Sequence, residues 1–247
     1  GLYWGHTATN GSVIWNPYLK NKVRLSYGSV IYGVMGAGKS SAIKDRIRKD
    51  LITNNYVRGF AINNEFAKII NYLGGEQISL DGSDGILNIL HVNKSAKDEG
   101  ISFLAHLDRV ANWFRFLAPQ VDDTHLVQLK SILRLFYDKT MGYNINDRSC
   151  QITGLSGMDY PTLSELLAFV EKDRDHIINY DEVRAIRDIK LERIERLTLY
   201  LDDAVKNMGR IFDGHTTLPN IYDQPCVFYN MENLRNLDSK VFDAQLY

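Results

Sequence analysis

Hydrophobic and polar positions follow two different spacings over roughly the first 95 residues. Short runs rich in Val, Ile, Tyr and Phe, typical of buried strands, alternate with stretches whose apolar residues recur every three or four positions, as on one helix face. This alternation predicts an α/β region with a parallel sheet. The predicted elements are a strand at Ser29–Tyr32, a helix at Ser40–Leu51, a strand at Val57–Ile62, a helix at Glu65–Leu73 and a strand at Gln77–Leu80.

From about Lys97 the pattern changes to helix after helix for more than a hundred residues. Thr162 and Glu165 have the spacing of a capping box, which satisfies backbone N–H groups at a helix start. Gly209 is expected to close the last helix of this block, because glycine favours the position just after a helix end. The predicted helices are Ile101–Leu117, Asp123–Tyr137, one beginning after Thr162, and Asp181–Met208.

The last segment returns to α/β character, with a predicted strand at Pro225–Tyr229 and a predicted helix at Leu237–Tyr247. The simplest architecture is therefore a parallel sheet interrupted by an all-helical insertion. We predict an α/β core made of residues 1–95 and 210–247, and an all-α insertion at residues 96–209.

Composition removes several classes of protein. The 247 residues carry 29 Lys and Arg against 30 Asp and Glu, so the net charge of −1 supports neither disorder nor a polybasic nucleic-acid binder. The two cysteines, Cys150 and Cys226, are too few for a disulfide framework. No apolar run is long enough to span a membrane. Because the chain begins with Gly1 and stops within a helical pattern, we expect it to be a piece of a longer protein.

One motif carries chemistry. Gly33 to Ser40 fits G-x-x-x-x-G-K-[ST], the phosphate-binding (Walker A) pattern, and it lies between a predicted strand and a predicted helix, as this motif requires. Gly36 and Gly38 keep the turn free of side chains, so that backbone N–H groups and the helix N-terminus can surround phosphate oxygens. The expected nucleotide-binding residues are Gly33, Val34, Met35, Gly36, Ala37, Gly38, Lys39, Ser40 and Ser41.

The same motif predicts ATP and Mg²⁺ as ligands. Lys39 is expected to place its ammonium on the β- and γ-phosphates, and the Ser40 hydroxyl to coordinate Mg²⁺. Hydrolysis also needs an acidic residue at the end of a neighbouring strand. Glu65, just after the second predicted strand, is the best candidate, and with Lys39 it completes the candidate catalytic residues. Its alternative role is to place negative charge at a helix start.

The other strand ends offer no convincing acid to hold magnesium. Asn63 follows the second predicted strand, and Asn230 follows the strand near the end of the chain. Asp81 follows only a weakly apolar run. The six histidines are scattered without the spacing of a metal site.

Several separate stretches of the chain together carry a family resemblance. They are Gly1–Gly5, the phosphate loop, Glu65-Phe66, Leu73–Gly75, Leu87-Asn88, Phe212–Gly214 with Thr216, and Val227–Tyr229. In this order they resemble the C-terminal motor domain of conjugative-transfer, or type IV secretion, ATPases, the VirB/TraC/TraE-like relatives of the FtsK and HerA pumps. The resemblance covers the whole chain. It departs from the family at Ala61–Phe66, where the usual Asp-Pro before the Glu is missing, and at Asn88-Ile89, where the usual second residue is Pro.

The resemblance implies a RecA-like core with an all-helical insertion, in a subunit of a homo-hexamer at the cytoplasmic face of a membrane-spanning channel. It implies an ATPase that energises assembly of the apparatus and export of DNA or protein, with other channel proteins as partners. In the family, the magnesium-side Asp-Glu follows the helix that begins near Leu237. We therefore expect this piece to bind Mg-ATP but to hydrolyse it weakly.

Two other functions stay open. A DNA-pumping coupling protein would line a ring with basic residues, for which Lys44, Arg46, Arg48 and Lys49 are available, although the solvated face of that helix is the better explanation for them. A non-catalytic assembly module would use nucleotide only as a structural ligand or not at all. The missing acid and the altered segment at Ala61–Asn64 favour that module.

Overall fold

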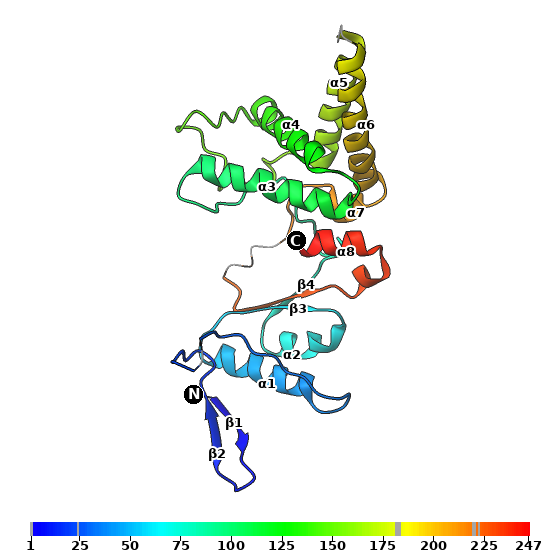
Figure 1. Cartoon of the computed structure of the whole chain (residues 1–247). Helices are drawn as coiled ribbons and strands as arrows, with labels where there is room; N and C mark the ends of the chain where they lie inside the picture. The colour runs from blue at the N-terminus through cyan, green and yellow to red at the C-terminus, as the bar shows by residue number, and fades with distance from the viewer. Residues whose placement is uncertain (1, 24, 181–183, 219–220, 222) are drawn as a thin grey trace. The chain divides into compact units, whose positions relative to one another are not determined.

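The secondary structure alternates strands and helices at both ends of the chain and is helical between them (Figure 1). The computed structural model describes residues 2–23, 25–180, 184–218, 221 and 223–247. The elements are β1 (Leu2–His6), β2 (Ser12–Trp15), α1 (Lys39–Ile52), β3 (Val57–Ala61), the 3-10 helix η1 (Asn64–Phe66), α2 (Ala67–Tyr72), β4 (Glu76–Ser79), α3 (Glu99–Leu117), α4 (Asp123–Met141), α5 (Leu163–Tyr180), α6 (Arg184–Lys206), α7 (Gly209–Phe212), β5 (Cys226–Asn230), the 3-10 helix η2 (Asn233–Asn236) and α8 (Ser239–Leu246).

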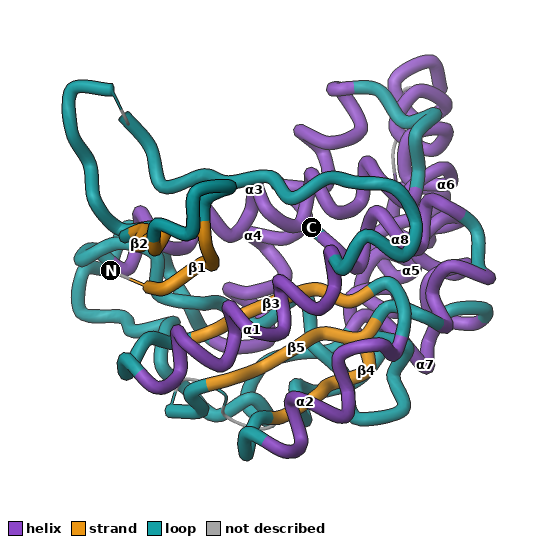
Figure 2. Tube along the Cα trace, turned by 90° about the horizontal axis from the view of Figure 1, so that it is seen from below, coloured by secondary structure: helices purple, strands orange, loops and turns teal. Residues whose placement is uncertain are grey.

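Strands β3, β5 and β4 form a parallel sheet in that order, so the strand that comes last in the chain is the central one (Figure 2). At the two ends of the β3–β5 pair, Val57 N–H donates to the Pro225 carbonyl at 2.8 Å and Met231 N–H donates to the Ala61 carbonyl at 2.9 Å. A central parallel strand is covered on both faces, which favours apolar residues. The first three residues of β5, from Cys226 to Phe228, are accordingly buried. The predicted α/β class with a parallel sheet is confirmed.

The chain divides into two compact units, and each has its own packing. The smaller holds the first residues, the glycine-rich motif and the first halves of the sheet strands, whereas the larger holds the long helices. The smaller unit comprises residues 1–59, 64–77 and 222–228, and the larger comprises residues 60–63, 78–221 and 229–247.

The smaller unit has a thin core made by aromatic rings and close glycine contacts. Phe66 stacks on Phe228 with ring centroids 5.5 Å apart. The Phe228 ring lies directly over Gly59, where a Cβ would stand 2.5 Å from it. Strands β1 and β2 form an antiparallel hairpin on which Trp4 meets Trp15 edge to face at 5.0 Å. The hairpin adds little to this core, since its strands are half-buried at most.

The larger unit has a dense helical core, as the spacing of apolar residues along α3, α4, α5 and α6 predicts. Phe103, Leu133 and Leu166 are at most 1% exposed. Two of these helices have side-chain caps at their N-termini. Asp98 accepts the Ile101 N–H at 2.9 Å. The predicted capping box is also present, with the Thr162 N–H donating to Glu165 at 2.7 Å. Each cap satisfies backbone donors that a helix start leaves without a partner.

A buried polar chain crosses this core between α3 and α4. Arg109 can only donate, so His106 Nδ1 accepts from it at 2.8 Å and the Nε2–H donates to the Tyr137 hydroxyl at 2.8 Å. The Tyr137 hydroxyl in turn donates to the Leu90 carbonyl at 2.5 Å. Burial, assisted by the nearby Arg109 charge, holds the pKa of His106 well below its ordinary value. The ring is therefore neutral, and both of its nitrogens have hydrogen-bond partners.

The helices Ile101–Leu117 and Asp123–Tyr137 are confirmed, as are the strands Val57–Ile62, Gln77–Leu80 and Pro225–Tyr229, and no end differs from its prediction by more than four residues. The helical prediction Glu65–Leu73 is also confirmed, as η1 followed by α2. Gly74 follows it with a left-handed φ of 69°. The helix predicted at Leu237–Tyr247 is confirmed as α8.

Two predicted features are wrong. Ser29–Tyr32 forms neither strand nor helix, and Tyr32 is 90% exposed. A strand needs a partner for its backbone N–H and C=O groups, and in the described part of the chain the sheet ends at β3 on one side and β4 on the other. Gly209 does not close α6, which ends at Lys206, but begins the short helix α7. The predicted start of that long helix, Asp181, lies outside the described residues.

Candidate functional site

The glycine-rich motif forms a tight turn that leads directly into α1. Gly36 and Gly38 have φ values of 82° and 85°, in the left-handed region that other residues rarely adopt. A Cβ at either position would meet nothing within 4 Å. The positive φ values by themselves favour glycine at both positions. That side chains here would also obstruct a phosphate stays a prediction. The turn is closed by the Ala37 N–H, which donates to the Val34 carbonyl at 3.2 Å.

The Lys39 side chain folds back onto the turn and stabilises it through hydrogen bonds. Its ammonium donates to the Gly33 carbonyl and to the Val34 carbonyl, each at 2.8 Å. An ammonium has three donors, so at least one stays available. The lysine thereby places a positive charge against the residues that begin the motif. The two carbonyl acceptors belong to the backbone, so no pattern of residue types would have revealed them.

The N-terminus of α1 adds further donors beside this charge. Gly38 is the N-cap and has no side chain to accept a hydrogen bond, and no acidic residue occupies the first turn. The N–H groups of the first turn therefore lack the usual capping partner, and the helix dipole at this end is not neutralised. Ser40 lies half-buried in this first turn. Ammonium, helix N-terminus and a hydroxyl thus fall within one short segment, a combination suited to a phosphate group and its cation.

Glu65 lies in η1, in the same unit as the glycine turn, and its side chain is exposed. The neighbouring Phe66 packs inward, and the Lys44 ammonium of α1 lies 5.7 Å from the centre of its ring. This contact brings η1 beside α1. Asn64, the residue before, is already engaged, because its Oδ1 accepts from Gln77 at 2.9 Å.

Asp81, which follows β4, is committed to a local turn. It accepts from the Ser83 hydroxyl at 2.5 Å, from the Ser83 N–H at 2.9 Å and from the Asn233 amide at 2.5 Å. Partial burial raises the pKa of Asp81, but these hydrogen bonds outweigh it and hold the pKa well below its ordinary value. The carboxylate therefore stays charged and occupied by the protein's own donors.

The basic residues of α1 are largely neutralised by acids of the same helix. Arg46 pairs with Asp50 at 2.6 Å, while Arg48 and Lys49 pair with Asp45 at 2.7 and 2.5 Å. Their spacing of three or four residues is that of ordinary helix-surface ion pairs.

Searches for two other kinds of site gave no candidate in the described ranges. No group of three or more His, Cys, Asp or Glu side chains is arranged to hold a metal ion there. Within the same ranges, no helix combines the length and the apolar character needed to cross a bilayer.

Comparisons with known proteins give the fold a counterpart. No family model matches the chain. An uncharacterized protein of Bacillus anthracis is 29% identical over 263 aligned residues, which cover all of this chain and 40% of that protein. The structure of VirB4 of Thermoanaerobacter pseudethanolicus matches 99% of this chain with a TM-score of 0.81 at 20% identity.

This chain spans 60% of the length of the VirB4 chain and 40% of the length of the Bacillus protein. At 20% identity the likeness to VirB4 concerns the fold. The family resemblance drawn from the sequence is thus confirmed at the level of chain architecture.

Proposed function

We propose that this chain is the ATP-binding motor domain of a type IV secretion ATPase, and that it binds Mg-ATP through the turn Gly33–Ser41. The observation that carries the proposal is the joint geometry of the turn: two left-handed glycines, an uncapped helix N-terminus and the Lys39 ammonium all lie at one end of α1. The VirB4 fold supports the same proposal independently of that geometry.

In this proposal Lys39 exchanges its partners when nucleotide binds. Its ammonium leaves the carbonyls of Gly33 and Val34 and takes up the β- and γ-phosphates, while N–H groups from Gly36 to Ser41 surround the phosphate oxygens. Ser40 contributes its hydroxyl to Mg²⁺. Glu65 is the candidate for orienting the attacking water, because it is acidic, exposed and follows β3.

We propose further that the parent protein has a RecA-like core with an all-helical insertion at residues 96–209. It would work as a homo-hexamer at the cytoplasmic face of the membrane, with other proteins of the secretion channel as partners. The VirB4 fold supports this placement in a machine that assembles a conjugation or secretion apparatus.

Hydrolysis by this chain alone should be weak. Of the candidate positions at strand ends, Asn63 and Asn230 are amides, and Asp81 is occupied by Ser83 and Asn233. We expect turnover well below about 1 per second, the lower end of typical enzyme values. Steady-state phosphate release measures it, and turnover in the typical range would contradict this expectation.

A DNA pump is the weaker alternative for this chain. Three of the four basic residues that it would use pair with Asp45 or Asp50. Such pairs leave less charge for DNA phosphates. Binding to DNA that weakens steeply with added salt would favour the pump.

Thermal unfolding with and without Mg-ATP tests nucleotide binding. A ligand at 100 times its Kd stabilises the native state by about 2.7 kcal/mol, which for a chain of this size raises Tm by about 5–10 °C. Lys39→Ala should abolish the shift, since it removes the charge on the phosphates. Ser40→Ala should weaken binding of Mg-ATP more than binding of ATP in EDTA.

Lys139→Ala is the matched control, because Lys139 is exposed on α4 and its removal should leave the shift unchanged. A shift that persists in Lys39→Ala would contradict the assignment of the turn. A shift lost equally in Lys139→Ala would show that the effect is not local to the turn.

A further inference from the structure

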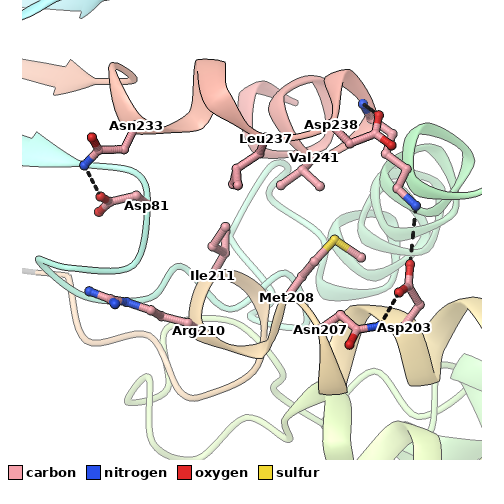
Figure 3. Close-up of a pocket in the computed structure, with 11 residues that line it drawn as sticks. Asp81, Asp203, Asn207, Met208, Arg210, Ile211, Asn233, Leu237, Asp238 and Val241 are labelled. Atoms are coloured by element: carbon pink, nitrogen blue, oxygen red, sulfur yellow. Dashed lines mark hydrogen bonds and ion pairs between the residues drawn. The ribbon is translucent and has the colours of Figure 1, made fainter.

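The larger unit contains a groove of about 690 Å³ that plays no part in the proposed nucleotide site. It runs between the corner of α6 and α7 on one side and η2 with the start of α8 on the other, and the turn after β4 closes one end (Figure 3). A volume of this size lies in the range of ligand-binding pockets.

The middle of the groove is apolar. Leu237 and Val241 project from one wall, and Ile211 and Met208 face them from the other (Figure 3). Val241 and Ile211 are buried, whereas Leu237 is 46% exposed. A bulky apolar side chain left half open beside an apolar floor and a charged rim is typical of a surface that binds another protein segment.

Each acidic side chain of the rim accepts at least one hydrogen bond from within the protein. Asp81 accepts from Ser83 and Asn233. Asp203 accepts from Asn207 at 2.7 Å and faces the Lys240 ammonium at 3.4 Å. Asp238 caps α8 by accepting the Lys240 N–H at 3.1 Å.

Arg210 is the exception on this rim. Its side chain is exposed and makes no hydrogen bond or ion pair with the residues that the structure describes. Its backbone packs closely against Gly82: a Cβ at Gly82 would stand only 2.0 Å from the Arg210 carbonyl oxygen. A guanidinium offers five donors in a planar fork that matches a carboxylate. At this end of the groove Arg210 therefore offers donors that no described residue of the protein uses.

We propose that this groove binds a peptide segment of a partner protein in which a carboxylate side chain lies next to bulky apolar side chains. The carboxylate pairs with Arg210, and an apolar side chain enters between Leu237 and Ile211. This partner is recognised by charge complementarity at one end and apolar contact in the middle. The proposal does not depend on nucleotide binding, because the groove and the glycine turn belong to different units.

Selection of a random peptide library displayed on phage against the full immobilised chain tests the proposal. The expected result is enrichment of peptides that combine Asp or Glu with adjacent Leu, Ile or Phe. An enriched peptide is then synthesised with a fluorescent label, and its Kd is measured by anisotropy.

Arg210→Glu should weaken binding of that peptide by about tenfold or more, because an attractive pair becomes a repulsive one. Leu237→Ser should weaken it by about fivefold through lost apolar contact. Both side chains are at least partly exposed, so folding should survive, which far-UV circular dichroism checks. Arg148→Glu is the matched control, since Arg148 is also exposed and lies outside the groove, and it should leave Kd unchanged.

Three outcomes would overturn the proposal. The first is no enrichment over a control protein. The second is an enriched peptide without acids, or one whose Kd is the same for Arg210→Glu as for the unaltered chain. The third is self-association of the chain that Arg210→Glu abolishes, which would assign the groove to a second copy instead.

Discussion

The glycine turn and the helical core differ in what holds their backbones in place. Around the turn, apolar side chains contribute little packing, since Val30 is 85% exposed and Met35 is 98% exposed. Two left-handed glycines and the hydrogen bonds of the Lys39 ammonium determine the backbone shape there. In the core, packed apolar side chains hold the backbone in place, with Phe103 and Leu133 buried among other apolar residues.

This difference shows where binding capacity resides. In the core, Asp98 caps α3, and the buried side chains of His106 and Tyr137 hydrogen-bond to each other, so these polar groups are already engaged. The turn has uncapped helix N–H groups and a lysine resting on exchangeable carbonyls. A segment that must close around a ligand needs such unsatisfied groups, and it tolerates lower local stability to have them.

The largest expected effect is on the free energy of unfolding and comes from a substitution in the helical core. Phe103→Ala should lower the free energy of unfolding by about 3–5 kcal/mol, because it leaves a cavity in a fully packed site. Tyr32→Ala should change it by less than about 0.5 kcal/mol, since its ring is exposed. Urea unfolding followed by circular dichroism measures both. A cost for Tyr32→Ala near that of Phe103→Ala would mean that Ser29–Tyr32 is packed in solution as the predicted strand.

The next effect concerns the turn. Gly38→Ala forces a Cβ into left-handed backbone, which costs about 1–2 kcal/mol, so the turn should relax and the affinity for Mg-ATP should fall about tenfold. Gly28→Ala is the control, because Gly28 does not have a positive φ and a Cβ there would have room. Titration calorimetry gives the two Kd values. Equal affinities would show that the left-handed backbone is not needed for binding.

Helices could be predicted well because their signals are local. Apolar spacing and the capping box of Thr162 and Glu165 lie within a few residues of the helices they control. The predicted strand at Ser29–Tyr32 failed for the opposite reason: whether a β-branched run becomes a strand depends on a partner elsewhere in the chain. The glycine turn was located from its residue pattern, but the left-handed backbone at Gly36 and Gly38 became visible only in the φ values.

The groove could not be predicted from the sequence at all. Asp81 and Asn233 meet across 152 residues, and Gly82 meets the Arg210 backbone across a similar separation. Asp81 stood out in the sequence only as a weak candidate for holding magnesium. Its true partners became visible only when distant segments were placed side by side.

The third prediction concerns the pH dependence of that distant contact. The pKa of Asp81 is lower in the folded chain than the value of about 3.9 expected when unfolded, so the carboxylate stabilises the fold above that pH. This contribution, about 1–2 kcal/mol for hydrogen bonds to a charged group, is lost as the pH falls below about 4. Asp81→Asn should therefore flatten the acid limb of a plot of urea midpoint against pH. Asp138→Asn, on exposed α4 surface, is the control and should keep the limb of the unaltered chain.

The smallest expected effect on the free energy of unfolding comes from removing surface ion pairs. It tests whether these pairs compensate for the thin core of the smaller unit. Arg48 pairs with Asp45 on α1, and Lys130 pairs with Asp108 in the larger unit. Exposed pairs contribute about 0.2–1 kcal/mol, because water and salt screen them, so Arg48→Ala and Lys130→Ala should each cost less than about 0.5 kcal/mol in the urea assay. If Arg48→Ala alone cost more than about 1.5 kcal/mol, the smaller unit would depend on its helix-surface charges. In that case the two units would differ in kind of stabilisation as well as in density of packing.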